Sequence, residues 1–595
     1  MSWFIDYTSR AAHDPPRLTA YVLRFVRYAL GHGLDRFGLL VIIVTYVTLS
    51  LYQLQLPGLH YDEAFEAVPA LQILRGQPVV AFRDGGLLLG RQLYPLMTQD
   101  YIGALNTYAV IPFILLFGAT TTALRVFSTI IGAITLLLAY HLSYQLSGRV
   151  QVGLSAALLL AVDPTFVFWN RQGIFVTAIT ATIGLGAAYC WLRRLQGGGR
   201  LWSIAGGFLF GLGIFAKLLF IWLILALIGA LFLLSLPGLL KKRRRPAGFL
   251  LSLLNQPPIQ IKEILLTILA FVLGCWPLII YNIQTSGTLL SITRNAQTSY
   301  YGVNNLAIGS NLVERSAQFV RLLDGSHLWY LGRIVSNPVS IAVFVIVLLS
   351  VILPNFMTIR KQNSPPPAGD EPAAKSALFP FLVVGLVILA SIQTVSALWV
   401  THFAILMPWP AIAVALGSGF ALIRLRPYDR AYVLRAIIWS GLGLLIITNL
   451  VSTLRYHQAL TESGGLSGHS DAIYDLSNWL DNRAAGEVVA MDWGLAAPIF
   501  YLTGGQVNPI EVFGYAWQPD GELTARLTEF IEQPATYYLW RAPDEIIFDR
   551  SVEFKALYRP LHLEETIEEA FYERSGRPIL GVTRLVPAGT AANPP

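Results

Sequence analysis

Long apolar runs alternate with short polar segments from residue 37 to about residue 455. A transmembrane helix needs about 20 consecutive apolar residues to cross the hydrocarbon core of a bilayer, and most of these runs approach that length. The pattern therefore predicts a polytopic α-helical membrane protein with about eleven spans. The predicted spans are Phe37–Leu56, Leu124–Leu146, Gly153–Trp169, Ile174–Leu192, Leu201–Ala216, Leu218–Leu240, Ile264–Tyr281, Ile334–Pro354, Leu378–Ala397, Phe403–Leu422 and Ala436–Leu454.

One apolar stretch, Gly103–Gly118, is too short to be counted among these spans. It contains Pro112, and a helix that rises about 1.5 Å per residue would fall short of a ~30 Å hydrocarbon core over this length. We therefore expect it to lie as a helix near the outer surface. This assignment places every dense basic cluster on one side of the membrane, as the positive-inside rule expects. The clusters on that side are Arg193–Arg194, Lys241–Arg245, Arg360–Lys361 and Arg424–Arg435.

This topology divides the chain into three parts. Residues 1–36 form a cytoplasmic N-terminal segment whose mixture of apolar and basic residues predicts a helix lying on the membrane surface. Residues 37–455 form the transmembrane part, with long outer loops at residues 57–122 and 282–333. Residues 456–595 are polar enough for a soluble extracytoplasmic domain. The protein is accordingly expected in the cell membrane (plasma or inner membrane).

Helical and strand-like stretches alternate in the tail, which predicts a small α/β domain. Asp471–Leu480 has the spacing of an amphipathic helix, and Glu487–Met491 has the composition of a buried strand. Trp493–Leu502 is expected to be a second helix, ended by the two glycines that follow at Gly504 and Gly505.

Composition agrees with the membrane class, and it argues against a nucleic-acid-binding protein and against a disulfide-rich or cysteine-metal protein. The 595 residues are 54% hydrophobic and only 13% charged, where a soluble protein carries roughly 25% charged residues. The net charge of +7 comes from short basic clusters between apolar runs, which are topology signals and not a nucleic-acid footprint. Cys190 and Cys275 both fall in apolar runs, so the sequence offers no disulfide framework or cysteine cluster for a metal.

The first outer loop begins with the most unusual stretch of the chain, Leu59–Glu66. It holds three carboxylates and a histidine in a chain where charge is scarce, and acids at a membrane edge are costly and usually kept for a function. The alternative is that Asp62 caps a helix N-terminus and that Glu63 and Glu66 favour the helix dipole.

Other charged groups stand where spans reach the outer side. Asp163 precedes Pro164, with Arg171 close behind, and Lys217 interrupts an otherwise uncharged stretch at a predicted outward hairpin. A lysine can bind phosphate as a point charge. The alternative is structural: Asp163 marks a helix boundary, while Arg171 and Lys217 extend to lipid headgroups.

The sequence His60–Ala64 resembles the His-x-Asp-Glu-Ala motif of family 39-type glycosyltransferases. These are the protein O-mannosyltransferase and lipid A aminoarabinose transferase relatives of the GT-C class. Tyr101–Arg125 is similar to the family's first-loop helix and the start of its second span, and Ala161–Pro164 is similar to its Leu-Asp-Pro element. His402–Pro408 is similar to its Arg-Tyr-x-x-x-x-Pro pattern, with His in place of Arg.

The resemblance covers about residues 37–455 and implies a glycosyltransferase of the GT-C class. The donor would be a polyprenyl-phosphate sugar, and the acceptor a protein, lipid or glycan on the extracytoplasmic face. The family's Lys-Pro-Pro is absent near Tyr94–Leu96, where Arg91 is the available cation; this departure bears on the identity of the donor.

An inverting transfer of this kind needs a base for the acceptor hydroxyl and cations for the departing lipid phosphate. Asp62 is the predicted base, and Glu63 shares that role or orients the acceptor. The predicted substrate-binding residues are Asp163, Lys217, His402, Arg91, Asp100 and Arg171, with Arg125, Arg294 and Arg315 as weaker phosphate candidates.

Asp62, Glu63, Asp100 and Asp163 could also supply oxygen ligands to Mg²⁺ or Mn²⁺, although no spacing requires a metal. Two other classes of function compete with the transferase. A transporter or flippase of lipid-linked substrates would show repeated halves and charges at mid-membrane, whereas the conspicuous charges here stand at span ends. A non-catalytic membrane scaffold would use its tail to bind a partner.

Overall fold

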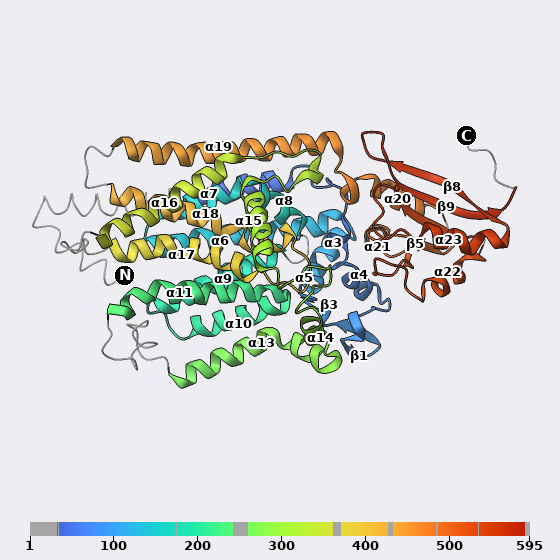
Figure 1. Cartoon of the computed structure of the whole chain (residues 1–595), viewed down its shortest axis with the longest axis horizontal. Helices are drawn as coiled ribbons and strands as arrows, with labels where there is room; N and C mark the ends of the chain where they lie inside the picture. The colour runs from blue at the N-terminus through green and yellow to red at the C-terminus, as the bar shows by residue number, and fades with distance from the viewer. Residues whose placement is uncertain are drawn as a thin grey trace, which may run out of the picture.

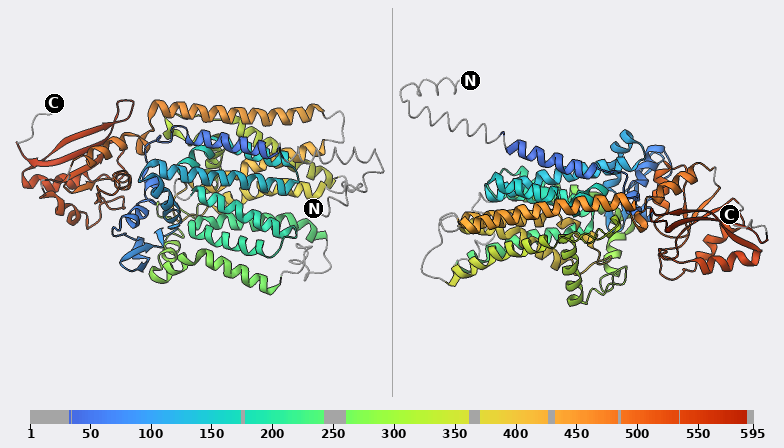
Figure 2. Two further views of the ribbon diagram at one scale, coloured as in Figure 1. Left: turned by 180° about the vertical axis from the view of Figure 1, so that it is seen from behind. Right: turned by 90° about the horizontal axis from the view of Figure 1, so that it is seen from above.

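The molecule has two parts, a bundle of long helices and a sheet with its own helices at one end of the bundle (Figure 1). Figure 2 shows the same arrangement from two further directions. The computed structural model describes residues 33, 35–173, 177–241, 260–360, 370–425, 432–483, 486–533 and 535–589. The surface helix expected before residue 37 therefore lies almost wholly outside the described residues.

The bundle contains most of the apolar runs predicted as spans. Its first helix covers residues 35–51. The others are α6 (Thr121–Ser147), α7 (Val150–Ala161), α8 (Pro164–Gln172), α9 (Thr177–Leu195), α10 (Leu201–Ala216), η3 (Leu218–Phe220), α11 (Ile221–Lys241), α13 (Ile261–Thr285), α16 (Pro338–Arg360), α17 (Asp370–Ala390), η6 (Val400–Leu406), α18 (Pro408–Arg424) and α19 (Tyr432–Ser463).

The protein is an integral membrane protein. Within the described residues, five helices are long and apolar enough to cross a bilayer, and counting each of two bent helix pairs as one span raises the number to seven. Several expected spans are shorter apolar helices, among them α10 with 16 residues. The count of about eleven, which assumed roughly 20 residues per span, stays a prediction.

The expected straight span Gly153–Trp169 is instead two helices, α7 and α8, bent by 66°. Asp163 lies at the break, where its Oδ1 accepts a hydrogen bond of 2.9 Å from the backbone N–H of Phe166. Pro164 is the first residue of α8 and lacks the N–H that would continue the hydrogen bonds of α7. The Asp-Pro pair therefore ends one helix and begins the next.

The expected span Leu378–Ala397 also differs, because α17 ends at Ala390 and residues 391–399 are mostly irregular. Side chains of the neighbouring segment satisfy their backbone carbonyls. Asn311 donates to Ile392 O at 3.2 Å, and Arg315 donates to Ser391 O at 3.0 Å. Irregular backbone inside a membrane bundle requires such partners.

The loop that follows the first helix is folded throughout. It contains α3 (Tyr61–Ala64), α4 (Val68–Arg75), η1 (Phe82–Asp84), the hairpin of β1 (Gly86–Leu89) and β2 (Gln92–Pro95), the pair β3 (Met97–Gln99) and β4 (Ile102–Gly103), and α5 (Leu105–Phe117). The short apolar stretch Gly103–Gly118 thus forms the helix α5, as expected. The loop before α16 contains α14 (Gly287–Arg294), α15 (Ile308–Asp324) and η5 (Trp329–Leu331).

The tail is an α/β unit whose first elements match the expected ones. It contains η8 (Ser467–His469), α20 (Ala472–Asp481), β5 (Val488–Ala490), α21 (Ala496–Leu502), β6 (Ile510–Glu511), α22 (Leu523–Ile531), β7 (Tyr537–Arg541), α23 (Ser551–Tyr558), η9 (Arg559–Leu561), β8 (Leu563–Tyr572) and β9 (Pro578–Pro587). The strand order is β6-β5-β7-β9-β8. β5 is parallel to β6 and β7, and β9 is antiparallel to β7 and β8.

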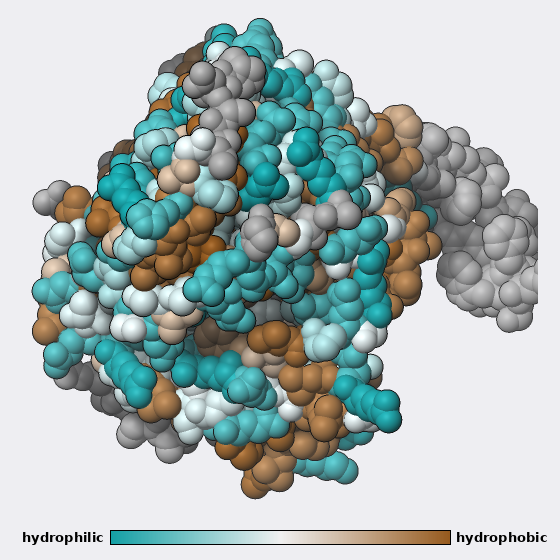
Figure 3. Space-filling model, turned by 90° about the vertical axis from the view of Figure 1, so that its right-hand side faces the viewer, coloured by the Kyte–Doolittle hydropathy of each residue, from teal (hydrophilic) through white to brown (hydrophobic). Residues whose placement is uncertain are grey.

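The tail packs directly on the first loop. Leu59, Tyr61 and Ala64 share one buried apolar cluster with Phe500 and Tyr501 of the tail. The outer face of the tail is mostly hydrophilic with separate hydrophobic patches (Figure 3). The acidic stretch therefore lies between the bundle and the tail.

Candidate active site

Asp62 is the second residue of α3, and its side chain does not cap the helix. The cap is His60, whose Nδ1 accepts the backbone N–H of Asp62 at 3.2 Å. The structural alternative that made Asp62 the cap is therefore wrong. The Asp62 side chain is 11% exposed, and its Oδ1 is buried with no hydrogen-bond partner in the described part of the chain. A buried, unpaired carboxylate oxygen is costly unless something else uses it.

Burial dominates the electrostatics of Asp62. Burial raises the pKa of the Asp62 carboxyl well above its ordinary value, and the charge of Lys217 opposes that rise. Burial also lowers the pKa of His60 to about 3, so its ring is neutral. The approach of His60 Nδ1 to Asp62 Oδ2 at 3.6 Å is consequently not an ion pair, and Lys217 is the cation that acts on Asp62.

Both carboxylate oxygens of Glu63 accept hydrogen bonds from one arginine. Arg125 of α6 donates from Nε to Oε1 at 2.7 Å and from Nη2 to Oε2 at 2.9 Å. Both side chains are buried, with exposures of 0% for Arg125 and 1% for Glu63. Arg125 also donates to Leu54 O at 2.8 Å. Glu63 thus joins the first loop to α6, and neither of its oxygens is free to act as a base.

Glu66 lies beyond the short helix α3 and is buried. Burial raises the pKa of its carboxyl to about 7, and Asn106 and Lys217 oppose that rise. The expectation that Glu66 supports the helix N-terminus is wrong, because α3 ends at Ala64. Glu66 and Asp62 instead share the charge of Lys217.

Backbone pairing brings Lys217 to this place. The N–H of Leu218 donates to Tyr101 O at 2.9 Å, and Lys217 forms a β-bridge with Ile102 of β4. The turn between α10 and η3 is therefore tied to the first loop. Lys217 is 6% exposed, so it does not extend to lipid headgroups as the structural alternative required.

His402 links Lys217 electrostatically to a second basic residue, Arg315. His402 is 8% exposed and interacts electrostatically with both Lys217 and Arg315. Arg315 is fully buried and donates to Ser391 O and, at 2.9 Å, to Gln318 Oε1. Its Nη2 is buried and has no partner among the described residues. We call Lys217, His402 and Arg315 the cation group.

The chain resembles known proteins in sequence and in fold. A family model described as dolichyl-phosphate-mannose-protein mannosyltransferase matches residues 106–259. The crystal structure of ArnT from Cupriavidus metallidurans bound to undecaprenyl phosphate is similar over 95% of this chain and 99% of that one, with a TM-score of 0.56 and 12% identity. The crystal structure of the same protein in the apo state is similar over 93% of this chain and 98% of that one, with a TM-score of 0.55 and 11% identity. No curated protein matches the sequence.

The chain has the GT-C glycosyltransferase fold. The likeness extends over nearly the whole length of both chains, so it includes the bundle, the first loop and the tail. The fold expected from the His60–Ala64 motif and its loop is confirmed.

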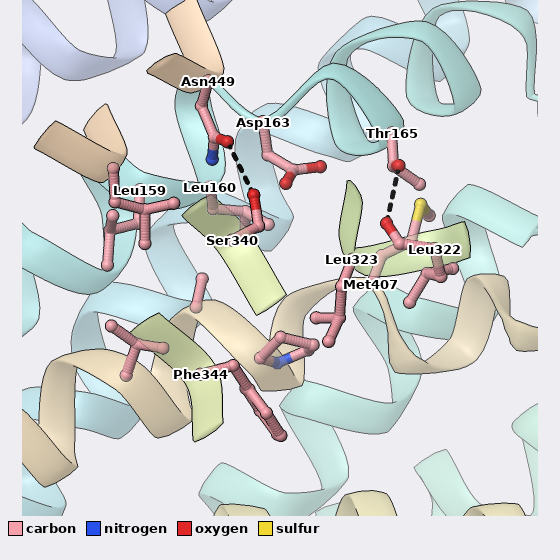
Figure 4. A pocket seen from close by; sticks show the side chains of 14 residues that line it. Leu159, Leu160, Asp163, Thr165, Leu322, Leu323, Ser340, Phe344, Met407 and Asn449 are labelled. Atoms are coloured by element: carbon pink, nitrogen blue, oxygen red, sulfur yellow. Dashed lines mark hydrogen bonds between the residues drawn. The ribbon is translucent and has the colours of Figure 1, made fainter. Parts of the chain in front are cut away.

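Within this GT-C fold, Asp163 lies away from the Asp62 region. It lines a different pocket, formed mainly by apolar side chains of α7, α15, α16, α18 and α19. Figure 4 shows its carboxylate beside Thr165 and near the hydrogen-bonded pair Ser340 and Asn449. The residues that line this pocket do not include Asp62.

The remaining predicted residues are engaged in the scaffold of the GT-C fold or lie at its surface. Arg171 is fully buried and donates from Nη2 to Gln53 O at 2.5 Å and Leu56 O at 2.7 Å. Asp100 accepts from Arg83 Nε at 2.7 Å and from Tyr281 Oη at 2.8 Å. Arg91 is exposed in the turn between β1 and β2.

The four acids considered as metal ligands have separate surroundings. Glu63 binds Arg125, Asp100 binds Arg83, and Asp163 lies in the second pocket. No three His, Cys, Asp or Glu side chains in the described ranges are arranged to hold a metal ion. Asp62, Glu63, Asp100 and Asp163 therefore do not fit as ligands of one shared divalent ion.

The tail reaches the site through aromatic rings. His469 stacks on His60 at 4.0 Å and on Tyr330 at 4.0 Å. Trp493 contacts Tyr61 at 4.7 Å, and the N–H of Gly58 donates to His469 O at 2.7 Å. The cap of the Asp62 helix is therefore held by the tail, which sequence patterns did not indicate.

Proposed function

We propose that this protein is a membrane glycosyltransferase that moves a sugar from a polyprenyl-phosphate donor to an acceptor on the extracytoplasmic face. One observation carries the proposal. The buried carboxylate of Asp62, whose Oδ1 has no hydrogen-bond partner among the described residues, lies within electrostatic range of Lys217, and Lys217 belongs to the cation group with His402 and Arg315. A base and a phosphate-binding cluster thus adjoin each other, as this reaction requires.

The reaction follows from these roles. Asp62 takes the proton of the acceptor hydroxyl as its oxygen attacks the anomeric carbon. The bond from that carbon to the phosphate oxygen breaks, and the lipid phosphate leaves with the electron pair. The new glycosidic bond forms on the face opposite the departing phosphate, so the configuration inverts. Lys217 and Arg315 stabilise the charge that develops on the phosphate.

Glu63 is a positioning residue in this proposal. Its two hydrogen bonds to Arg125 anchor the start of the first loop to α6. The next residue along the chain from Asp62 is thereby immobilised, which fixes the direction of the Asp62 side chain. A base held in place loses less entropy when the acceptor binds.

The similar structure of ArnT supports a lipid-phosphate donor, because that protein was crystallised with undecaprenyl phosphate. The two chains share the fold over 95% of this one. The match of residues 106–259 to the mannosyltransferase family model points to the same class of donor.

The proposal is tested by Asp62→Asn in the full chain in lipid nanodiscs. Transfer of radiolabelled sugar from a panel of undecaprenyl-phosphate donors to membrane extract should fall by at least about 100-fold, because general-base catalysis contributes that much. Asp84→Asn, which changes an exposed acid of the same loop, should leave transfer unchanged. Wild-type rates in Asp62→Asn with intact folding would contradict the assignment of the base.

A further inference from the structure

A loop of the tail presents two aromatic side chains near the Asp62 helix. Residues 512–520, between β6 and α22, form what we call the aromatic loop. Tyr515 and Trp517 are 49% and 64% exposed. Both rest on Phe548, at ring distances of 6.1 Å and 5.5 Å. Large aromatic side chains on a polar surface are typical of binding sites.

The aromatic loop is held in shape by a buried arginine. Arg550 is 2% exposed. It donates to Phe513 O at 2.8 Å, to Ala516 O at 2.5 Å and to Trp517 O at 3.4 Å. Burying a guanidinium is costly unless its hydrogen bonds are made, and here three of them go to this loop.

A second arginine fixes the ends of the loop. Arg526 of α22 donates to Val512 O at 3.0 Å and forms two hydrogen bonds with Asp520, at 2.8 Å and 2.9 Å. The loop therefore presents its rings from a preorganised backbone. Preorganisation lowers the entropy that binding costs.

Hydroxyl groups connect the aromatic loop to the catalytic region. Tyr515 donates to Glu511 at 2.6 Å, and its hydroxyl lies 3.3 Å from that of Tyr61. Tyr61 immediately precedes Asp62 in α3. Tyr300 of the loop before α16 interacts electrostatically with Tyr515. The surface from Trp517 to Asp62 thus combines ring faces with hydroxyls and a carboxylate.

This combination fits a carbohydrate. One face of a pyranose ring presents C–H bonds of partial positive charge, which are attracted to the negative face of an aromatic ring. Its hydroxyls require donors and acceptors such as Tyr515 and Glu511. A peptide that binds by strand addition needs an open strand edge, and β6, the edge strand directly before this loop, has only two residues.

We propose that the aromatic loop is the acceptor platform of the enzyme and binds the carbohydrate portion of a glycan acceptor. The proposal rests on the proposed transferase function and adds the acceptor class. Trp517 stacks on a sugar ring, while Tyr515 and Glu511 bind hydroxyls and direct the acceptor toward Asp62.

The test measures binding without the reaction. The full chain in nanodiscs is titrated with four labelled tetrasaccharides, cellotetraose, maltotetraose, mannotetraose and chitotetraose, and with a labelled Gly-Ser-Thr-Gly peptide. At least one tetrasaccharide should bind, and Trp517→Ala should weaken it about fivefold to tenfold. The control variant Tyr572→Ala removes another exposed aromatic side chain of the tail, which is 55% exposed. It should bind the tetrasaccharide as tightly as the wild type does.

Two controls separate this proposal from the transferase itself. Trp517→Ala should bind undecaprenyl phosphate as the wild type does, and Asp62→Asn should still bind the tetrasaccharide. A failure of Asp62→Asn to stop transfer would therefore leave the binding result intact. Absence of binding to all four tetrasaccharides, unchanged binding in Trp517→Ala, or binding of the peptide in their place would each overturn the carbohydrate assignment.

Discussion

At the scale of single residues, the chain contains three acids within five positions that have three different environments. Glu63 is bound by Arg125. Within the described residues, Asp62 Oδ1 and both Glu66 oxygens are buried without a hydrogen-bond partner, and Lys217 acts electrostatically on both acids. Of the three, Asp62 donates its backbone N–H to the ring of the cap residue His60. Burial raises the pKa of Asp62, and the charge of Lys217 opposes that rise, so loss of this charge should raise the pKa further.

This arrangement predicts a shift in the pH dependence of transfer. Asp62 must be ionised to accept a proton, so kcat/KM should rise with pH as Asp62 loses its proton. The cation of Lys217 favours the ionised carboxylate, and Lys217→Met should therefore raise the pKa of Asp62 and move the rising limb to higher pH. The test compares the pH profiles of kcat/KM for the wild type, Lys217→Met and the exposed control Arg91→Met. If the rising limb of the Lys217→Met profile moved to lower pH, the prediction would be contradicted.

Lys217 should also bind the lipid phosphate. Charge-assisted hydrogen bonds contribute about 1.5–3 kcal/mol, which corresponds to roughly 10–100-fold in affinity. Lys217→Ala should weaken binding of undecaprenyl phosphate by this factor, measured by fluorescence titration in nanodiscs. The control is Lys555→Ala, which removes an exposed lysine of the tail, and an equal loss in both variants would indicate a nonspecific charge effect.

Individual site residues could be predicted only where the sequence itself was unusual. Asp62 and Lys217 were found because each interrupts an apolar context. The sequence does not distinguish Arg315 from the other outer-loop arginines. Its hydrogen bond to Ser391 O and its electrostatic interaction with His402 both depend on a segment that is distant in the sequence. Asp100 and Arg171 have equally unusual positions in the sequence, and tertiary structure gives them partners that the sequence does not indicate, Arg83 for Asp100 and the carbonyls of Gln53 and Leu56 for Arg171. Their predicted role in substrate binding stays a prediction.

At the scale of elements, the contact between α3 and α6 combines a buried apolar cluster with one buried ion pair. Glu63→Gln should destabilise the protein by about 3–5 kcal/mol, because it leaves the charge of Arg125 buried and uncompensated. Thermal unfolding in nanodiscs should show a large decrease in Tm. Glu568→Gln, which breaks the more exposed pair with Arg584, should change Tm little.

A double variant gives the matching check on that pair. Replacing Glu63 with Gln and Arg125 with Met together removes both charges and should recover part of the stability. If the double variant is as unstable as the sum of both single ones, the pair does not interact as described.

Helices were predictable where length and apolar composition decide, as in α6, α11 and α13. The α7–α8 bend and the irregular residues 391–399 were not, because both depend on tertiary partners. Asp163 supplies the cap at the first break, and Asn305, Asn311 and Arg315 supply hydrogen bonds at the second. Apolar composition alone does not distinguish a straight helix from a broken one.

At the scale of the whole molecule, the tail and the first loop meet with little space between them. A Cβ atom on Gly58 would lie 2.0 Å from Ser470 O, a backbone atom of the tail. Gly58→Ala should therefore displace the tail, increase cleavage at residues 464–468 in limited proteolysis, and reduce transfer. Gly521→Ala, where a Cβ meets nothing within 4 Å, should behave as wild type. Normal protease resistance in Gly58→Ala would contradict this close docking.

The stack of Tyr330, His469 and His60 also sets an order of assembly. A ribosome makes the chain from its N-terminus, so Asp62 is inserted long before His469 exists. The ring that covers the cap of α3 is therefore added only after all helices of the bundle have been synthesised. Until then, a nascent chain carries its acid without the ring stack that holds the cap of α3.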